Sequence, residues 1–337
     1  MAVLTLVDLP SAQRIGREYG LNIVAVKGIL AGSVNTNYEC TLDGGGRVFL
    51  RVYEEQGEEG ATREIKLLTH LGSRGVPTVQ PLLRSGDVEV ATLSTHEGKA
   101  AAIFPWVEGE VLCQQRVTEA VMVQVGRALA QIHVAGADFV GATHSRFNAD
   151  HLRGRLEKLR LQGYGKSGGM GPTRRGEIGA DVERLWEKLA AYVERENARG
   201  GEAPNALVHG DVFRDNVLWN NGQMAAVLDF ESASLGSVTF DLSVTMLAWC
   251  YNNELERPLA RALLRGYVSA RPLTDVDRER LFDDAIFAAL RFSVTRITDY
   301  ELRPKGTGIY KNYRRFLGRL RTIETLGEKG LPAFLGI

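Results

Sequence analysis

The fold of this chain is decided by one stretch of sequence, Leu207-Val208-His209-Gly210-Asp211-Val212-Phe213-Arg214-Asp215-Asn216-Val217-Leu218-Trp219. In it, a short apolar strand leads into a polar loop, and a second apolar run follows. Asp211 and Asn216 lie five positions apart within the loop. Further along, Val227-Leu228-Asp229-Phe230-Glu231 places another carboxylate at the end of an apolar strand. The stretch therefore predicts a polar site built where short strands end.

The side chains of this site suit phosphoryl transfer. Such a reaction needs one carboxylate that accepts or orients the acceptor hydroxyl, and oxygen ligands that hold Mg²⁺ on the phosphates. The residues Asn220-Asn221-Gly222-Gln223 indicate a hairpin between strands at 217–219 and 225–228. This hairpin would return Asp229 close to Asn216, which explains why the two residues are separated by the length of a hairpin in the sequence.

In these residues the sequence resembles the aminoglycoside phosphotransferase/choline kinase superfamily. The pattern His209-x-Asp211-x-x-x-x-Asn216 followed by Asp229 is similar to its catalytic and metal loops. The resemblance is closer to one branch, the bacterial homoserine kinases, in segments 28–38, 97–100, 213–218 and 240–245 with Trp249-Cys250.

The resemblance implies an α+β, bilobal, protein-kinase-like fold. A small antiparallel-sheet lobe, residues 1–107, would bind the nucleotide, and a larger, mostly helical lobe, residues 108–337, would carry catalysis and substrate binding. The implied reaction transfers the γ-phosphate of ATP to a small alcohol with the help of Mg²⁺. Homoserine is the first candidate acceptor, which would place the chain in threonine biosynthesis.

The resemblance also implies roles for the residues of the catalytic loop. Asp211 would be the catalytic base or hydroxyl-orienting carboxylate, and Asn216 and Asp229 would coordinate Mg²⁺. His209 is expected to pack and hydrogen-bond within the loop. Asp241 is expected to anchor the loop through backbone N–H groups.

ATP would be held by the first lobe. In the polar turn 32–37, backbone N–H groups with Ser33 and Asn35 could approach phosphates, although a plain polar turn is the alternative. Arg51 lies where superfamily kinases often carry a basic residue on the phosphates, with Glu64 as its ion-pair partner. This sequence departs from the usual lysine there, and a solvent-facing arginine is the alternative.

Two further segments bear on nucleotide binding. Pro105-Trp106-Val107-Glu108-Gly109 resembles the interlobe hinge, where Trp106 and Val107 would bind adenine, unless the segment is a mere turn. Gly165-Lys166-Ser167 looks like the end of a P-loop. However, Arg160 stands at the required leading glycine, so we interpret this segment as a solvated loop.

The acceptor pocket is expected beside Asp211. Arg291 or Arg296 would bind a substrate carboxylate, the alternative being arginines that pack or pair with Asp299 or Glu301. Glu231 stands where homoserine kinases usually carry an aromatic residue. It could face an amine, assist Mg²⁺ or be solvated, so choline, ethanolamine, hydroxylysine and aminoglycosides stay open as acceptors.

Hydrophobic spacing outlines the rest of the chain. A β-hairpin is expected at 38–42 and 48–53, and further strands at 88–93 and 100–104. The mostly polar stretch 163–179 predicts a surface loop. Helices are expected at 61–71, 118–134, 152–161 and 178–195, and through most of 238–321.

Composition restricts the class of protein. The chain of 337 residues has 41 basic and 41 acidic side chains, and this balance argues against a nucleic-acid partner. Three separated cysteines, no signal-like N-terminus and no long apolar run predict a cytoplasmic protein without membrane contact. A monomer or a homodimer is expected. A non-catalytic nucleotide-binding regulator is the rival function, although such proteins usually lose the base or a metal ligand.

Overall fold

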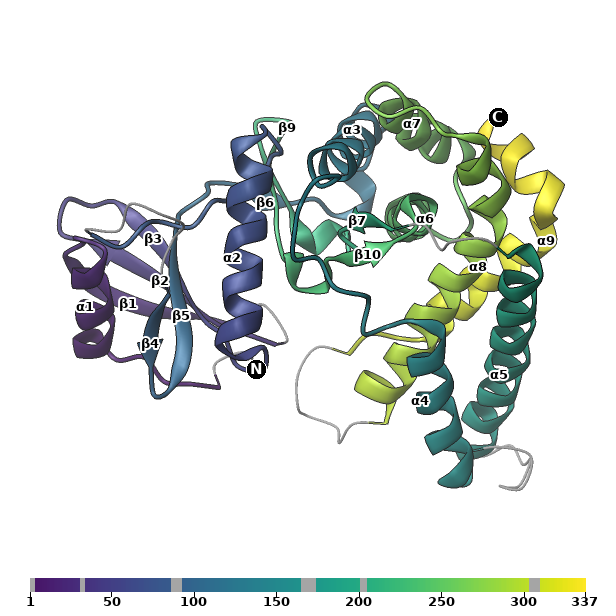
Figure 1. Ribbon diagram of the computed structural model, residues 1–337, viewed down its shortest axis with the longest axis horizontal. Coiled ribbons are helices and arrows are strands. Elements are labelled where there is room, and N and C mark those ends of the chain that lie inside the picture. Colours follow the sequence, from purple (N-terminus) through teal and green to yellow (C-terminus); the bar gives the residue numbers. More distant parts are fainter. Residues whose placement is uncertain (1–3, 31–33, 86–92, 165–173, 201–204, 303–309) are drawn as a thin grey trace.

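The structure is a computed structural model that describes residues 4–30, 34–85, 93–164, 174–200, 205–302 and 310–337. It has two lobes, an antiparallel sheet with two helices and a larger helical body (Figure 1). The bilobal α+β fold expected from the sequence is therefore confirmed. We call the two parts the N-lobe and the C-lobe.

The N-lobe is a five-stranded antiparallel sheet in the order β1-β2-β3-β5-β4. Two helices, α1 and α2, pack against it. The elements are α1 (Leu9–Glu18), β1 (Ile23–Ile29), β2 (Thr36–Leu42), β3 (Arg47–Val52), α2 (Gly57–Ser73), β4 (Ser94–His96) and β5 (Lys99–Pro105).

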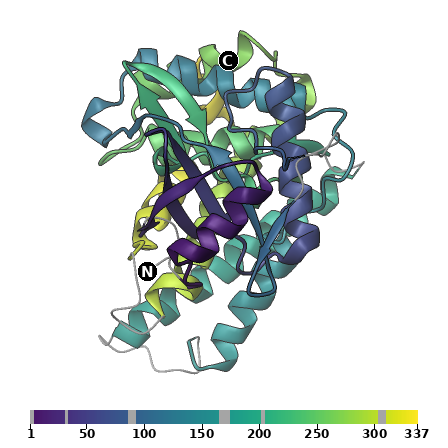
Figure 2. The same ribbon diagram turned by 90° about the vertical axis from the view of Figure 1, so that its left-hand side faces the viewer.

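Both faces of the sheet are covered, and β5 shows why. Side chains alternate along a strand, so Ala101 and Ile103 point to one face while Ala102 and Phe104 point to the other. The first pair belongs to the hydrophobic cluster under α1, and the second pair to the cluster that includes α2. A strand buried on both faces is apolar throughout, as residues 100–104 are. Figure 2 shows α1 lying across the face turned away from the C-lobe.

The C-lobe consists mainly of helices around a central one, α6 (Figure 1). Every residue of α6 except Phe240 is buried, and eight of its twelve residues are apolar, as expected for a helix covered on all sides. The surrounding helices are α3 (Glu119–Ala135), α4 (Ala149–Leu161), α5 (Arg174–Arg199), α7 (Arg257–Val268), α8 (Asp275–Arg296) and α9 (Arg314–Leu335), and α6 itself is Val238–Trp249.

Two small sheets carry the polar loop between the lobes. One has the order β6-β8-β9, from β6 (Glu110–Val111), β8 (Val217–Asn220) and β9 (Gln223–Val227). The other pairs β7 (Ala206–Val208) with β10 (Ser234–Gly236). The predicted hairpin is confirmed, and its two-residue turn places both Asn221 and Gly222 at positive φ, 50° and 77°. This Asn-Gly pair is the preferred sequence for that turn.

Several expected boundaries need correction. Leu93 lies outside a strand and β4 starts one residue later, while the rest of the strand expected at 88–93 lies outside the described residues. The predicted loop 163–179 is too long, because α5 already begins at Arg174. The sequence analysis did not predict α1 or β1. In the part of the chain that the structure describes, no helix is both long and apolar enough to span a bilayer.

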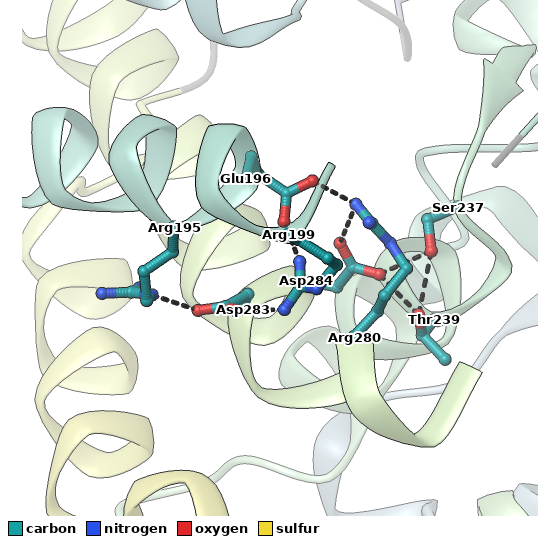
Figure 3. Close-up of polar contacts among 8 residues, drawn as sticks. All are labelled: Arg195, Glu196, Arg199, Ser237, Thr239, Arg280, Asp283 and Asp284. Carbon is teal, nitrogen blue, oxygen red and sulfur yellow. Dashed lines mark hydrogen bonds and ion pairs between the residues drawn. The ribbon is translucent and has the colours of Figure 1, made fainter. Parts of the chain in front are cut away.

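A network of charged side chains fixes the start of α6 (Figure 3). The hydroxyls of Ser237 and Thr239 each donate to Asp284 Oδ2 of α8 at 2.5 Å. Burial raises the pKa of Asp284 above its ordinary value. The network continues through the ion pair of Arg280 with Glu196, which joins α8 to α5. The first turn of α6 is thus held in place from two helices.

Close packing of α3 on α7 depends on glycine. A Cβ on Gly126 would lie 2.0 Å from the carbonyl oxygen of Leu263. Alanine normally stabilises a helix by about 1 kcal/mol relative to glycine. We expect Gly126→Ala to have the opposite effect and to lower the free energy of unfolding by about 1–3 kcal/mol, because the backbones of α3 and α7 must move apart.

The control for this prediction is Gly154→Ala in α4, where nothing lies within 4 Å of the added Cβ. This variant should be neutral or stabilised by up to about 1 kcal/mol. Urea unfolding of both variants measures the difference, and equal effects would contradict the packing argument.

Candidate active site

The catalytic loop brings Asp211 and Asn216 together. After β7, the chain turns through a short helical segment at Arg214–Asn216. The side-chain amide of Asn216 donates to the backbone oxygen of Asp211 at 2.8 Å and lies 3.4 Å from its Oδ2. Because the nitrogen is engaged within the loop, the amide oxygen of Asn216 is left for another partner.

The hairpin returns Asp229 to this loop. Val217 and Val227 are paired across β8 and β9, and the backbone N–H of Leu228 donates to the Asn216 carbonyl at 2.8 Å. The spacing argument from the sequence is therefore confirmed. Asp229 itself has φ 65°, in the left-handed region that non-glycine residues rarely adopt. Such strain is retained where a side chain must point in one direction, as at functional sites.

Asp241 anchors the start of the loop. Its carboxylate accepts hydrogen bonds from the backbone N–H groups of His209 and Gly210 at 2.7 and 2.8 Å. His133 Nε2 lies 3.0 Å from the same carboxylate, and His133 Nδ1 lies 2.8 Å from the hydroxyl of Tyr267. Burial alone would raise the pKa of Asp241, but these partners outweigh it and hold the pKa below its ordinary value.

His209 and Trp249 support the loop from two sides. His209 Nε2 lies 3.0 Å from the carbonyl of Leu228, and its ring packs on Phe230 with centroids 4.4 Å apart. The structural role expected for His209 is thus confirmed. Trp249 Nε1 donates to the carbonyl of Val212 at 2.9 Å. Sequence reasoning missed this bond because no local pattern links a helix C-terminus to a distant loop.

The N-lobe contributes a buried ion pair to the cleft between the lobes. Arg51 Nη1 lies 2.8 Å from Glu64 Oε1, and their side chains are 14% and 4% exposed. The expected partnership is present, and the solvent-facing alternative for Arg51 is wrong. Burial raises the pKa of Glu64, an effect that the charge of Arg51 opposes.

The same cleft has an apolar end. Its lining includes Phe49, Leu68, Phe104 and Leu218 beside the hinge, as well as Arg51, Glu64, Trp106, Val107 and Asp229. The guanidinium of Arg47 lies over the ring of Trp106, 4.5 Å from its centroid. An apolar slot next to a few charged groups has the character of a nucleotide site. Ser33 and Gly165-Lys166-Ser167 lie outside the described residues.

Glu231 bridges the two lobes. Its carboxylate lies 3.0 Å from Arg146 Nη2 and accepts a hydrogen bond from Asn35 Nδ2 at 3.2 Å. The side chain is only 9% exposed, so the solvated alternative is wrong. Burial and the nearby Asp229 raise the pKa of Glu231 to about 7. The oxygen of the Asn35 amide accepts from the backbone N–H of Glu54, so both ends of this amide are engaged within the protein.

Asp211 has cationic neighbours. Burial raises the pKa of its carboxyl, while the charges of Arg291 and Lys311 oppose the rise. Arg291 donates to the carbonyl of Gly210 and lies over the rings of Phe147 and Phe292. It therefore braces the loop from the side of α8.

Arg296 is the second arginine of this region. Burial lowers its pKa to about 10, and the charge of Asp211 opposes this. Its Nη1 donates to the Asn312 carbonyl at 3.3 Å, while its Nε has no hydrogen-bond partner in the described part of the chain. The alternative of a pair with Asp299 is wrong, because Asp299 pairs with Arg155 at 2.7 Å.

Comparison with known proteins assigns the chain to a family. A model of the phosphotransferase enzyme family matches residues 25–280. The chain belongs to this family. It is similar to the homoserine kinase of Methylocella silvestris, with 31% identity over 97% of this chain and 98% of that protein.

Solved structures show the same fold at low identity. A microcompartment-associated aminopropanol kinase superposes with a TM-score of 0.68 at 16% identity, covering 97% of this chain and 99% of that one. An amicoumacin kinase in complex with AMP-PNP, Ca²⁺ and Ami gives a TM-score of 0.66 at 14% identity, covering 96% and 94%. The protein-kinase-like fold of a phosphotransferase is thereby established for this chain.

The anchoring bonds predict the effect of Asp241→Asn. An amide can replace only one of the two acceptor oxygens, and its NH₂ then faces a backbone donor. We expect the free energy of unfolding to fall by about 2–3 kcal/mol and kcat to fall on the order of 100-fold.

The pH dependence checks the cause. The folded-state pKa of Asp241 lies below its unfolded value of about 3.9, so its contribution is complete above that value and is lost as pH falls through the folded pKa. The stability difference between wild type and variant should therefore be largest near neutral pH and vanish in acid. Asp150→Asn, an exposed change in α4, is the control and should cost less than about 0.5 kcal/mol.

Proposed function

We propose that this phosphotransferase transfers the γ-phosphate of ATP to the hydroxyl of homoserine. The observation that carries the proposal is the charge around Asp211, where Arg291, Arg296 and Lys311 surround the carboxylate expected to meet the acceptor. Such a pocket suits an acceptor that bears a carboxylate and disfavours a polycationic aminoglycoside. The relatives named homoserine kinase support the same acceptor.

In this proposal Asp211 receives the proton of the acceptor hydroxyl. The hydroxyl oxygen bonds to the γ-phosphorus, and the bond to the bridging oxygen of ADP breaks. Arg51, held by Glu64, contacts the phosphates, while Trp106 and Val107 border the adenine. Because the Asn35 amide is already engaged, we assign it the task of fixing the chain at residue 35 beside Glu231.

The metal is proposed to be Mg²⁺, held by Asn216 and Asp229. Their donors fit a hard cation, since an amide oxygen and a carboxylate are oxygen ligands and the Asn216 nitrogen is turned to the loop. When bound, the ion supplies charge neutralisation on the phosphates. The left-handed backbone at Asp229 would hold its carboxylate toward the cleft that it lines.

Of the two candidate arginines, we assign the substrate carboxylate to Arg296. Arg291 donates to the Gly210 carbonyl at the start of the loop and braces it, whereas Arg296 donates to Asn312, outside that loop. We also retain the division into a nucleotide-binding lobe, residues 1–107, and a catalytic lobe, residues 108–337, in a cytoplasmic protein that is a monomer or homodimer.

Two carboxylate variants separate the proposed roles. Asp211→Asn and Asp229→Asn should each abolish measurable turnover, a loss of at least about 100-fold. Affinity for Mg-ATP should fall mainly in Asp229→Asn, because only that variant loses a metal ligand. Calorimetric titration of Mg-ATP and a coupled assay of ADP release provide the two measurements. Equal ATP affinity in both variants would contradict the metal assignment, and Asp150→Asn again serves as the control.

The acceptor is tested with one panel in the ADP-release assay: homoserine, 3-aminopropan-1-ol, choline, ethanolamine, hydroxylysine and kanamycin. We expect the highest kcat/KM for homoserine, by at least about tenfold over 3-aminopropan-1-ol, which is homoserine without its carboxylate. A higher value for any carboxylate-free alcohol would overturn the homoserine assignment. Silence with every acceptor, despite Mg-ATP binding, would favour a regulatory protein.

A further inference from the structure

Another buried arginine of the C-lobe lacks a counter-charge among the residues that the structure describes. Arg319 of α9 is 7% exposed, and its Nε has no hydrogen-bond partner within the same residues. Its guanidinium lies against two rings, 4.3 Å from the centroid of Phe316 and 5.2 Å from that of Tyr251. Across the described ranges, no carboxylate forms an ion pair with it.

The charges nearest to Arg319 are of the same sign. Burial, and then the positive charges of Arg296, Arg315 and Arg214, lower its pKa to about 9. A buried, unpaired cation costs free energy, and like charges add to the cost. Contact with each ring recovers about 2 kcal/mol at a desolvated site, against a cost of several kcal/mol for burying an ion without a counter-charge. If Arg319 served packing alone, an apolar side chain of similar length would stabilise the fold more than the arginine does.

Arg319 lies next to the arginine already assigned to the substrate. Arg296 at the end of α8 is 4.5 Å from the centroid of the same Phe316 ring. Phe213 of the catalytic loop packs on that ring at 6.0 Å, two positions after Asp211. Both guanidinium groups therefore contact the Phe316 ring, which packs on the loop that carries Asp211.

We propose that Arg319 and Arg296 together form the carboxylate-binding site for the acceptor, with Arg319 as a specificity-determining residue. Each guanidinium group is a planar, forked donor, and neither forms an ion pair with a carboxylate of the described residues. Two such groups are suited to bind one planar anion. Arg214, which is half-buried, and the exposed Arg315 add positive potential at the edge of the site. The site selects alcohols that are also amino acids over amino alcohols without a carboxylate. This inference rests on the proposed function, because it names how that substrate class is recognised.

The kinetic test uses Arg319→Met, which keeps the length and apolar contacts of the side chain. We expect kcat/KM for homoserine to fall about 10- to 100-fold, mainly through KM. The kcat/KM for 3-aminopropan-1-ol and the KM for ATP should not change. Arg319→Lys, which keeps the charge but not the fork, should fall between wild type and Arg319→Met. The control is Arg257→Met, which removes an exposed arginine of α7 whose guanidinium lies over Phe334, elsewhere on α9. This variant should not change any of these kinetic constants.

Binding without turnover separates this inference from the proposed function. The probe is 2-aminobutyrate, which has the carboxylate of homoserine but no hydroxyl and cannot be phosphorylated. It should raise the melting temperature of the wild type and of Arg257→Met but not of Arg319→Met. Because the charge is uncompensated, ligand-free Arg319→Met should melt at or above the wild-type temperature. A variant that melts lower but still binds the probe would overturn the inference.

The outcomes remain distinct. A wild type that binds 2-aminobutyrate through Arg319 but does not phosphorylate homoserine contradicts the proposed function and supports the carboxylate site. If the protein phosphorylates homoserine and Arg319→Met still discriminates against 3-aminopropan-1-ol, the proposed function is supported and the carboxylate site at Arg319 is overturned. Absence of probe binding to the wild type also overturns it.

Discussion

The rest of the active site depends on one buried carboxylate, that of Asp241. It stands in the first turn of the central helix and holds two successive backbone N–H groups at the start of the catalytic loop. A charge in such a place is tolerated only because every oxygen has a donor. His133 supplies one of these, and the network around Asp284 fixes the helix itself. Loop geometry is thereby tied to the packing of α3, α5, α7 and α8.

The cleft lies between two lobes, and each lobe contributes different groups to it. The sheet of the N-lobe is covered on both faces and presents a charged pair, Arg51 and Glu64, at one end of an apolar slot. The hairpin of the C-lobe delivers Asp229 to the same slot. Glu231 then connects the lobes through Asn35, so closing or opening of the cleft must rearrange a nearly buried carboxylate. These few polar contacts connect the two lobes beside the cleft.

Electrostatics distinguish the acceptor side from the common scaffold. Family members of the same fold act on different alcohols, so specificity must come from side chains set on the C-lobe helices rather than from the fold. Here the distinguishing feature is the positive charge of Arg296 and Arg319, neither of which forms an ion pair with a carboxylate among the described residues. Its cost to stability is understandable where a ligand supplies the missing anion. Functional sites often retain such locally unfavourable features.

The sequence by itself determined the local features of this protein. Period-two and helical spacing predicted most elements, the Asn-Gly turn predicted the hairpin, and the spacing of Asp211, Asn216 and Asp229 predicted their convergence, because these signals are short-range. Only the tertiary structure decided that Glu231 is buried and that Arg319 lies beside Arg296. Those facts depend on contacts between helices and lobes far apart in the chain, for which no local pattern exists.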